Sequence, residues 1–252
     1  MLETREQIVQ DLKQLHMPTM RAGYEEVAMR ARRDSWSHEQ YLAELIGLEC
    51  EARRHHRIER NRHNSNLPPS KTFDTFDKNR LPAKVRNHLN VLSEGHFLDR
   101  CENVLAFGNP GSGKTHLLAA IGHQLVDRGK RVRFVTCAQL VRELLIAKRA
   151  LAIGKTLKKL AGYDAVIIDD IGYVQHDREE MEVLFTFLAD RYERGSVMVT
   201  SNLPFSKWER IFKDPMTTAA AIDRLVHHSV VLELNLPSYR LEHSKTRKDN
   251  KD

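Results

Sequence analysis

The chain has 252 residues, a net charge of +6 and a pI near 9.2, with 40 Lys and Arg against 34 Asp and Glu. This length allows one large domain with an appendage, and the positive charge favours a polyanionic partner without identifying one. Charges run through the N-terminus and no apolar run approaches a membrane span, so we expect neither a signal peptide nor a membrane segment. The three cysteines lack metal-ligand spacing. We therefore expect a cytoplasmic protein.

The first part of the chain has a helical pattern. Apolar residues recur at helical spacing through residues 8–15 and 24–31, and Pro18 and Gly23 interrupt the pattern. Ser37 and Gln40 have the spacing of a capping box that opens a longer helix. We predict a helical N-terminal domain over residues 1–63.

The end of this helical region is strongly basic. Residues 52–63 contain five arginines and three histidines against one glutamate, the arginines being Arg53, Arg54, Arg57, Arg60 and Arg62. Two interpretations stay open: a solvated helix end, or a surface that contacts nucleic-acid phosphates. The Pro, Asn and Ser content of residues 64–82 then indicates a linker.

From residue 83 onwards, apolar runs alternate with helical patterns. Strands are predicted at 104–107, 131–136, 165–169, 196–201 and 230–234, with helical segments between them. Such alternation is typical of a parallel sheet covered by helices on both faces, so the fold class is α/β. We assign residues 83–240 to this domain and expect residues 241–252 to form a disordered tail.

The sequence GNPGSGKT, Gly108 to Thr115, matches the P-loop pattern and lies between a predicted strand and a helix. Its glycines let backbone amides face phosphate oxygens, Lys114 can reach the β- and γ-phosphates, and Thr115 can ligate Mg²⁺. We therefore predict that ATP and Mg²⁺ bind here. The predicted nucleotide-binding residues are Gly108, Asn109, Pro110, Gly111, Ser112, Gly113, Lys114, Thr115 and His116.

Polar residues end the two next buried strands. AVIIDD places Asp169 at the carboxyl end of its strand, where it can hold Mg²⁺, and Asp170 directly after it. Asp170 is predicted to polarise an attacking water, although it could also be a surface acid. Asn202, after VMVTS, could orient that water or simply belong to a turn.

Five sequence blocks stand out in this order: GNPGSGKT, VIIDDIGY, ADRYERGSVMVTSNLPFSKW, AIDRLVHHS and PSYRL. Together they resemble the IstB family, the helper ATPases of IS21-type insertion sequences, and more distantly bacterial helicase loaders and initiators of the AAA+ class. The resemblance implies a P-loop AAA+ domain after a small helical domain. It also implies oligomers that assemble on double-stranded DNA, remodel it, and recruit or stimulate a transposase.

The resemblance also assigns residues. It implies that Asn202 is the sensor 1 residue, Arg224 an arginine finger and Arg240 a second sensor. Arg191 and Arg194 compete with Arg224 for the finger role. Because 28 residues follow Arg224, we expect no separate C-terminal lid.

The resemblance also assigns two aromatic residues. Phe73 and Phe76 align with a segment that wraps adenine in related ATPases, although they could also simply pack the linker onto the domain.

The chain departs from the family pattern at one position. Related proteins commonly carry Glu where this chain has Asp170, so slow intrinsic turnover is expected. For a basic stretch between the second and third strands, the resemblance implies contact with the DNA backbone; its predicted DNA-binding residues are Lys148, Arg149, Lys155, Lys158 and Lys159.

The sequence leaves three alternatives to a transposition helper. A replicative helicase loader would share the catalytic parts. A small-molecule P-loop kinase should lack the pair Asp170 and Asn202 and need no oligomer. A nucleotide-binding scaffold without hydrolysis is compatible with the shorter acid.

Overall fold

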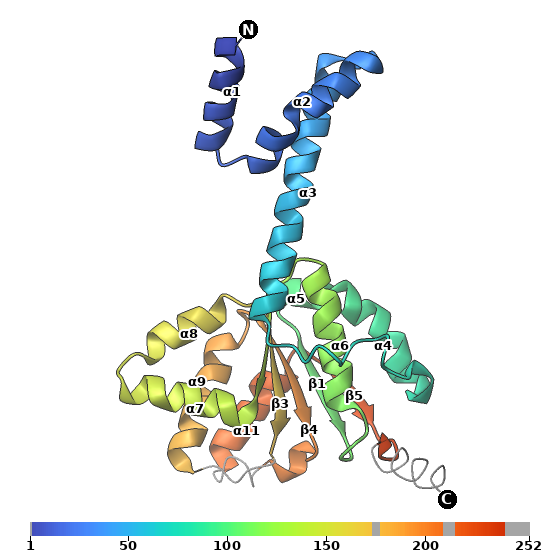
Figure 1. Ribbon diagram of the computed structural model, residues 1–252. Helices are drawn as coiled ribbons and strands as arrows, with labels where there is room; N and C mark the ends of the chain where they lie inside the picture. The colour runs from blue at the N-terminus through green and yellow to red at the C-terminus, as the bar shows by residue number, and fades with distance from the viewer. Residues whose placement is uncertain (1, 173–176, 209–214, 240–252) are drawn as a thin grey trace, which may run out of the picture. The chain divides into compact units, whose positions relative to one another are not determined.

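The computed structural model describes residues 2–172, 177–208 and 215–239. The predicted second sensor, Arg240, and the predicted tail, 241–252, lie outside these residues. The chain divides into two compact units, Met1–Arg60 and Asn61–Asp252 (Figure 1). In the described part of the chain, every helix is too short or too polar to cross a membrane.

The first unit consists of helices. α1 covers Leu2–Gln14, α2 covers Pro18–Arg33, and α3 covers His38–Asn64, so that the end of α3 belongs to the second unit. The Ser37 amide donates to the Gln40 side chain at 2.8 Å, and the Gln40 amide donates to the Ser37 hydroxyl at 3.2 Å. This reciprocal pair confirms the predicted capping box, which satisfies backbone groups where α3 begins.

A buried carboxylate joins two helices of the first unit. Glu49 on α3 is only 4% exposed and accepts hydrogen bonds from the amides of Thr19 and Met20 at 2.9 and 3.1 Å. Met17, which precedes α2, offers no capping side chain, so Glu49 supplies the cap from another helix. Burial opposes ionisation, but the hydrogen bonds from Arg53 and these amides outweigh it and lower the pKa of Glu49.

The second unit is built on a five-stranded sheet with the order β2-β3-β4-β1-β5, in which all neighbours are parallel. The strands are β1 (Asn103–Gly108), β2 (Val132–Thr136), β3 (Ala165–Ile171), β4 (Ser196–Ser201) and β5 (Ser229–Leu234). The helices are η1 (Lys78–Arg80), α4 (Ala83–Glu94), α5 (His96–Asp99), α6 (Lys114–Asp127), α7 (Cys137–Arg149), α8 (Ile153–Ala161), α9 (Arg178–Arg191), η2 (Phe205–Lys207) and α11 (Pro215–Val226). The predicted α/β class is confirmed.

Helices cover both faces of this sheet (Figure 1). One face packs against α7, α8, α9 and α11, with Leu105, Ile168 and Val199 as its strand residues. The other face packs against α4, α5 and α6 through Val104, Ile167 and Met198. Side chains alternate between the faces along each strand, and both faces are apolar, as a fully covered parallel sheet requires.

The basic stretch after β2 forms two helices. α7 ends at Arg149 and α8 begins at Ile153, and Leu151 between them has a φ of 52° and a side chain that is 96% exposed. The three cysteines are free thiols. Burial raises the pKa of Cys137 to about 12, so this side chain stays protonated in the core.

Replacement of Glu49 by Ala should loosen the start of α2. The two amides would lose their acceptor in a buried setting, at a cost of about 1–3 kcal/mol. Hydrogen exchange of a peptide that contains Thr19 and Met20 should accelerate about tenfold or more. Because the pKa of Glu49 is lowered, this protection is present at neutral pH and should be lost only as the pH falls below the ordinary titration range of a glutamate.

The matched control is Glu51→Ala, which removes an exposed carboxylate from the same helix. Equal exchange rates in the wild type and the Glu49 variant would contradict the capping role.

Candidate functional site

The P-loop leaves β1 at Gly108 and enters α6 at Lys114, as predicted. Gly108, Gly111 and Gly113 have φ values of 153°, 80° and 94°. A side chain at Gly113 would lie 3.2 Å from the ring of Phe76, so the bare backbone is needed there. Gly113 also caps α6 without a side-chain hydrogen bond, which leaves the first amides of the helix open to an anion.

Lys114 lies inside the loop and is 6% exposed. Its Nζ donates to the carbonyls of Gly108 and Asn109 at 2.8 and 2.9 Å, and to Oδ1 of Asn202 at 2.6 Å. These acceptors hold the ammonium group where the loop curls around it. A phosphate oxygen could replace them, because charge-assisted contacts to phosphate are stronger than contacts to neutral carbonyls.

Asp170 lies in an irregular part of β3. The pairing of β3 with β4 shifts between Ile168 and Ile171, and Asp170 has a φ of 66°. Asp is one of the few residue types that adopt this left-handed conformation readily. The irregularity turns Asp170 out of the ladder, and its side chain lines a pocket in front of the P-loop.

The hydroxyl of Thr200 replaces the missing ladder partner. Thr200 is 1% exposed, accepts from the Asp170 amide at 2.7 Å, and donates to Oδ1 of Asp169 at 2.7 Å. One hydroxyl on β4 therefore fixes both acids of β3. In the sequence, Thr200 is only one of the polar residues that end VMVTS, and the register shift that calls for its hydroxyl is not visible in a sequence pattern.

Asn202 connects the lysine to the second acid. Its Nδ2 donates to Oδ1 of Asp170 at 3.1 Å, while its Oδ1 accepts from Lys114. Lys114, Asn202 and Asp170 thus form one hydrogen-bonded chain across the ends of β1, β4 and β3. The structure brings together three residues that the sequence predicted as one catalytic group.

The pocket in front of this chain has a volume of about 480 Å³. This is within the range of small-molecule sites. Its lining includes the predicted residues Pro110, Gly111, Ser112, Gly113, Lys114, Thr115, His116, Phe76, Asp170 and Asn202. Gly108, Asn109 and Asp169 are not among its lining residues; the carbonyls of the first two accept from Lys114, and the carboxylate of the third accepts from Thr200.

One wall of the pocket comes from the segment before η1. The rings of Phe76 and His116 meet edge to face at 5.0 Å, and His116 Nε2 lies 2.9 Å from the Thr72 carbonyl. Burial lowers the pKa of His116, so the ring is neutral and donates to that carbonyl. Phe73 lies outside the lining and packs into the core beneath, with Lys78 over its ring at 4.6 Å.

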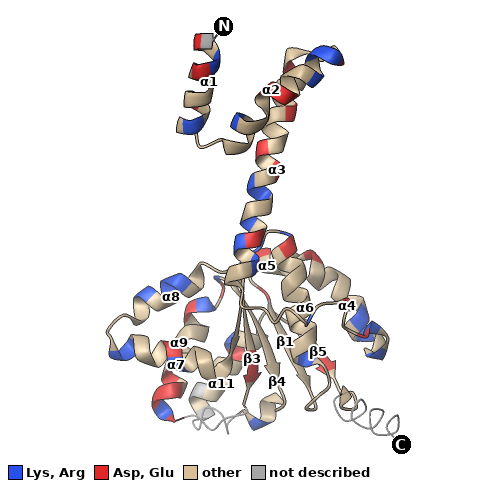
Figure 2. Ribbon diagram, viewed as in Figure 1, with Lys and Arg blue, Asp and Glu red and all other residues tan. Residues whose placement is uncertain are grey.

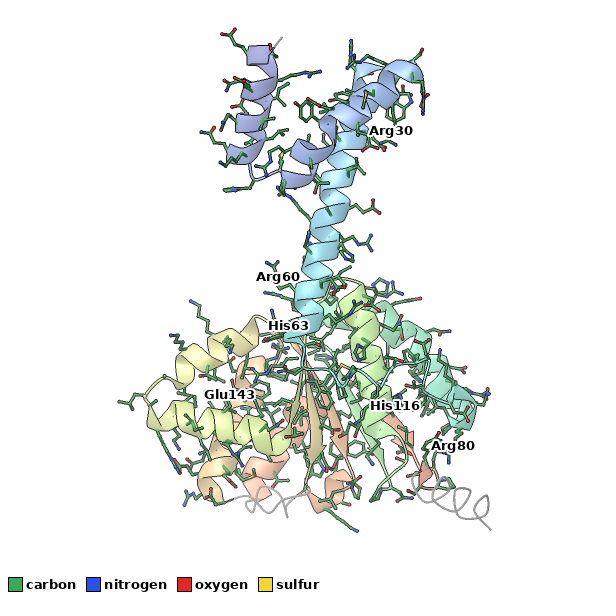
Figure 3. The ribbon with its side chains drawn as sticks, in the orientation of Figure 1. Arg30, Arg60, His63, Arg80, His116 and Glu143 are labelled. Carbon is green, nitrogen blue, oxygen red and sulfur yellow. The ribbon has the colours of Figure 1, made fainter. Side chains whose placement is uncertain are left out.

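Sequence reasoning missed several lining residues, namely Lys71, Thr75, Asp77, Arg80, Leu236 and Tyr239. Arg80 stacks over the ring of Tyr239 at 5.1 Å, and the Tyr239 amide donates to the Gly111 carbonyl at 3.1 Å. Figure 3 labels Arg80 and His116 on this side of the second unit. In the sequence, only position could have indicated a role for these residues: four of them lie in or near TFDTF, and Leu236 and Tyr239 lie shortly before Arg240.

The residues at the pocket fit a triphosphate with a hard divalent cation. Ser112 Oγ is buried and lacks a hydrogen-bond partner within the described residues, as expected of a donor aimed at a missing anion. The predicted Mg²⁺ ligands, Thr115 and Asp169, offer a hydroxyl and a carboxylate, which are oxygen donors of the type that Mg²⁺ prefers.

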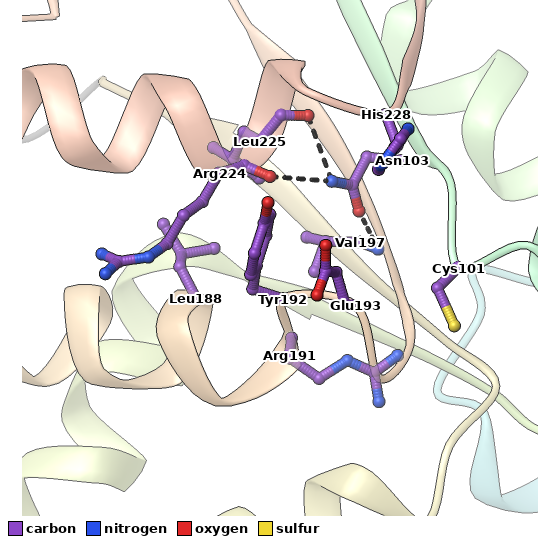
Figure 4. A pocket seen from close by; sticks show the side chains of 10 residues that line it. All are labelled: Cys101, Asn103, Leu188, Arg191, Tyr192, Glu193, Val197, Arg224, Leu225 and His228. Carbon is purple, nitrogen blue, oxygen red and sulfur yellow. Dashed lines mark hydrogen bonds between the residues drawn. The ribbon is translucent and has the colours of Figure 1, made fainter.

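The predicted finger, Arg224, does not line this pocket. It lies in the last turn of α11, with its guanidinium 4.5 Å from the ring of Phe185, and its Nη1 has no hydrogen-bond partner in the described part of the chain. Figure 4 shows the guanidinium turned away from Asn103, at a different pocket of only about 10 Å³.

The two competing arginines differ from Arg224. Arg191 is 2% exposed and donates to the carbonyls of Leu160, Tyr163, Asp164 and Ser196 at 2.8–3.2 Å. Because burial lowers its pKa without neutralising it, these four carbonyls are what makes the buried charge tolerable. Arg194 is exposed and pairs with Asp190 at 3.7 Å. Arg191 is therefore a structural residue.

The predicted DNA-contacting residues fall into two groups according to their partners. Figure 2 colours the Lys and Arg residues blue, among them those of α3 and α8. Four are held by partners: Arg53 by Glu49 and the His16 carbonyl, Arg62 by Asp127, and Lys148 and Arg149 by acids of α9. The other six are exposed and have no ion pair within the described residues: Arg54, Arg57, Arg60, Lys155, Lys158 and Lys159. Figure 3 labels Arg60 on α3.

Known structures share this fold. AMPPCP-bound DnaA from Aquifex aeolicus matches with a TM-score of 0.58 and 18% identity over 74% of this chain and 56% of that chain. The DnaC helicase loader matches with a TM-score of 0.55 and 19% identity over 66% of this chain and 98% of that one. At these identities, the matches show a shared fold.

Sequence relatives cover nearly the whole chain. An insertion sequence ATP-binding protein of Sinorhizobium fredii is 40% identical over 91% of this chain and 77% of its own length. The ATP-binding protein of insertion sequence IS21 from Pseudomonas aeruginosa is 33% identical over 93% and 88%. The family described as IstB-like ATP binding protein matches residues 10–247. The chain therefore belongs to the IstB-like family of insertion sequence ATP-binding proteins.

Proposed function

We propose that this protein is an ATPase that assembles on double-stranded DNA, remodels it, and recruits or stimulates the transposase of an insertion sequence. The observation that carries the hydrolytic part is the chain from Lys114 through Asn202 to Asp170. A kinase would use a hydroxyl of its substrate as the nucleophile. Here an acid and an amide are already joined beside the phosphate loop, where a water molecule can be held.

Hydrolysis would start from a rearrangement of Lys114. When its ammonium group moves to the β- and γ-phosphates, Oδ1 of Asn202 loses its donor and can accept a hydrogen bond from the attacking water. Asp170, still bonded to Nδ2 of Asn202, can take one proton of that water as its oxygen attacks the γ-phosphorus and the bond to ADP breaks, and the phosphate product keeps the other hydrogen. Mg²⁺ held by Thr115 and Asp169 would neutralise phosphate charge.

Arg224 would act on a neighbouring subunit. It lies outside its own pocket, with its guanidinium over an aromatic ring, and its buried Nη1 has no partner among the described residues, so the side chain would have to turn outward to donate to a phosphate oxygen. An arginine supplied by the next subunit stabilises the charge on the transferring phosphoryl group and can raise the rate by roughly 10³–10⁵. Hydrolysis would then depend on assembly.

The DNA contacts would come from the six exposed basic residues that have no ion pair within the described residues. Contacts of this kind are made to phosphates and carry little sequence preference. On α8, Ile153 and Leu157 pack against the core while Lys155, Lys158 and Lys159 are exposed, which leaves the lysines free to follow a DNA backbone.

A helicase loader is the second candidate, favoured by the structural similarity to the DnaC loader. The relatives that cover most of this chain at 33–40% identity are named as insertion sequence proteins, and this favours the transposition role.

One experiment tests the proposal. The full chain is mixed with duplex DNA, with and without ATP and Mg²⁺, while assembly size and phosphate release are measured together. DNA should promote assembly and hydrolysis in parallel, and Lys114→Ala should abolish the hydrolysis. A monomer that hydrolyses ATP at full rate without DNA would refute the proposal.

Replacement of Asp170 by Asn should separate binding from chemistry. Asn tolerates the left-handed backbone at this position and can keep a hydrogen bond to Asn202, but it cannot accept a proton. We expect ATP affinity within about twofold of the wild type and a kcat lowered by about 100-fold or more. Nucleotide binding and phosphate release are the two measurements, and an unchanged kcat would remove Asp170 from the mechanism.

Replacement of Thr200 by Val should disturb both acids while keeping the shape of the side chain. Loss of a residue that orients a metal ligand costs about 10–100-fold, so kcat should fall and the Mg²⁺ concentration for half-maximal activity should rise. Thr200→Ser should restore most of the activity. Thr186→Val, an exposed threonine on α9, is the control. An unchanged Mg²⁺ dependence in Thr200→Val would argue against this role.

Joint replacement of Arg54, Arg57 and Arg60 by Gln should weaken DNA binding. It should also reduce the slope of log affinity against log salt by about 0.9 for each DNA phosphate that the variant no longer neutralises. The control removes equal charge from Lys13, Arg21 and Arg32, which are exposed elsewhere in the same unit. If both triple variants give the same titration and slope, α3 does not hold a DNA-binding surface.

A further inference from the structure

Two imidazoles and a carboxylate converge on the surface of the second unit, where two helices end. Glu193 follows α9, and His227 and His228 connect α11 to β5. One ligand atom from each of the three lies within 4.8 Å of the others. Within the described residues, no other group of three or more His, Cys, Asp or Glu has such geometry. None of the three lines the nucleotide pocket.

The backbone places these side chains from fixed elements. The His227 amide donates to the Asp223 carbonyl at 2.9 Å, which continues the helical pattern of α11. The His228 carbonyl accepts from the Asn103 amide at 2.7 Å, so it is held at the first residue of β1. The rings of these two adjacent histidines meet edge to face, with centroids 4.1 Å apart.

A tyrosine orients one of the imidazoles. The Tyr192 hydroxyl lies 3.1 Å from Nδ1 of His227, which leaves Nε2 of that ring for a ligand. Metal-binding histidines are commonly held in this way by a second group that fixes the ring. Figure 4 shows Tyr192 and Glu193 at the end of α9 and His228 beside Asn103.

The ligand types select the ion. Two imidazole nitrogens and one carboxylate oxygen suit Zn²⁺, with water in a fourth position, whereas Mg²⁺ and Ca²⁺ prefer oxygen alone. Bonds of about 2.0–2.2 Å require ligand atoms closer together than in this arrangement. All three side chains are exposed, so they can close around an ion by rotation without moving the core.

We propose that Glu193, His227 and His228 form a zinc site that clamps the end of α9 to the turn between α11 and β5. Arg224 lies one helical turn before His227, so the ion would also hold the end of the helix that carries it. That consequence rests on the proposed function, whereas zinc binding itself does not.

The test uses the full chain after chelator treatment, without nucleotide or DNA, and titrates Zn²⁺ by calorimetry. The wild type should bind one ion at this site, and Zn²⁺ should raise its unfolding temperature, because binding to the folded state stabilises it. His228→Ala and Glu193→Gln should each weaken this binding at least about tenfold, and Tyr192→Phe should weaken it about tenfold.

The control replaces His55 and His56, an adjacent and exposed pair on α3, by Ala. This double variant should keep both the zinc affinity and the thermal shift. The proposal is overturned if His228→Ala and Glu193→Gln bind Zn²⁺ like the wild type, or if the wild type shows no binding. Because no ATP is present, neither result depends on whether the protein is an ATPase.

Discussion

The candidate site depends on the hydrogen-bonded chain from Lys114 through Asn202 to Asp170. Its members are far apart in the sequence and meet because β4 lies between β1 and β3 in the sheet. A parallel sheet brings the carboxyl ends of these strands to one edge. Lys114 follows β1 through the P-loop, Asp170 lies near the end of β3, and Asn202 directly follows β4. The site therefore requires this strand order, which brings the three side chains together, as well as the P-loop sequence.

Much of this could be predicted from sequence, since the controlling features are local. The P-loop pattern specifies its own backbone, and buried strands are visible in the sequence as apolar runs. The strand ends predicted at 107, 169 and 201 therefore lie within two residues of the observed ends, Gly108, Ile171 and Ser201. The bridge made by Thr200 was not predictable, because it depends on a register shift between two strands. The same holds for Arg80 and Tyr239, which reach the pocket through tertiary contacts alone.

The positions of basic residues in the sequence predicted DNA-contacting residues less well than the contacts these residues make in the structure. The basic stretches predicted ten DNA-contacting residues, yet Arg53 supports a buried carboxylate and Arg62, Lys148 and Arg149 have acidic partners. Arg191 is a similar case. The sequence offered it as an alternative arginine finger, but its guanidinium donates hydrogen bonds to four backbone carbonyls. A count of basic residues cannot separate a guanidinium that holds the fold from one that is free to bind phosphate.

The central claim is that each nucleotide is cleaved with an arginine from a neighbouring copy, and subunit mixing tests it most directly. Lys114→Ala and Arg224→Ala proteins, each inactive alone, are combined on duplex DNA and phosphate release is measured. In a random equal mixture, roughly a quarter of the contacts would pair an intact Lys114 with an intact Arg224 from the next subunit. The account predicts restored hydrolysis at about that fraction of the wild-type rate. A mixture no more active than its separate components, although both bind DNA, would contradict it.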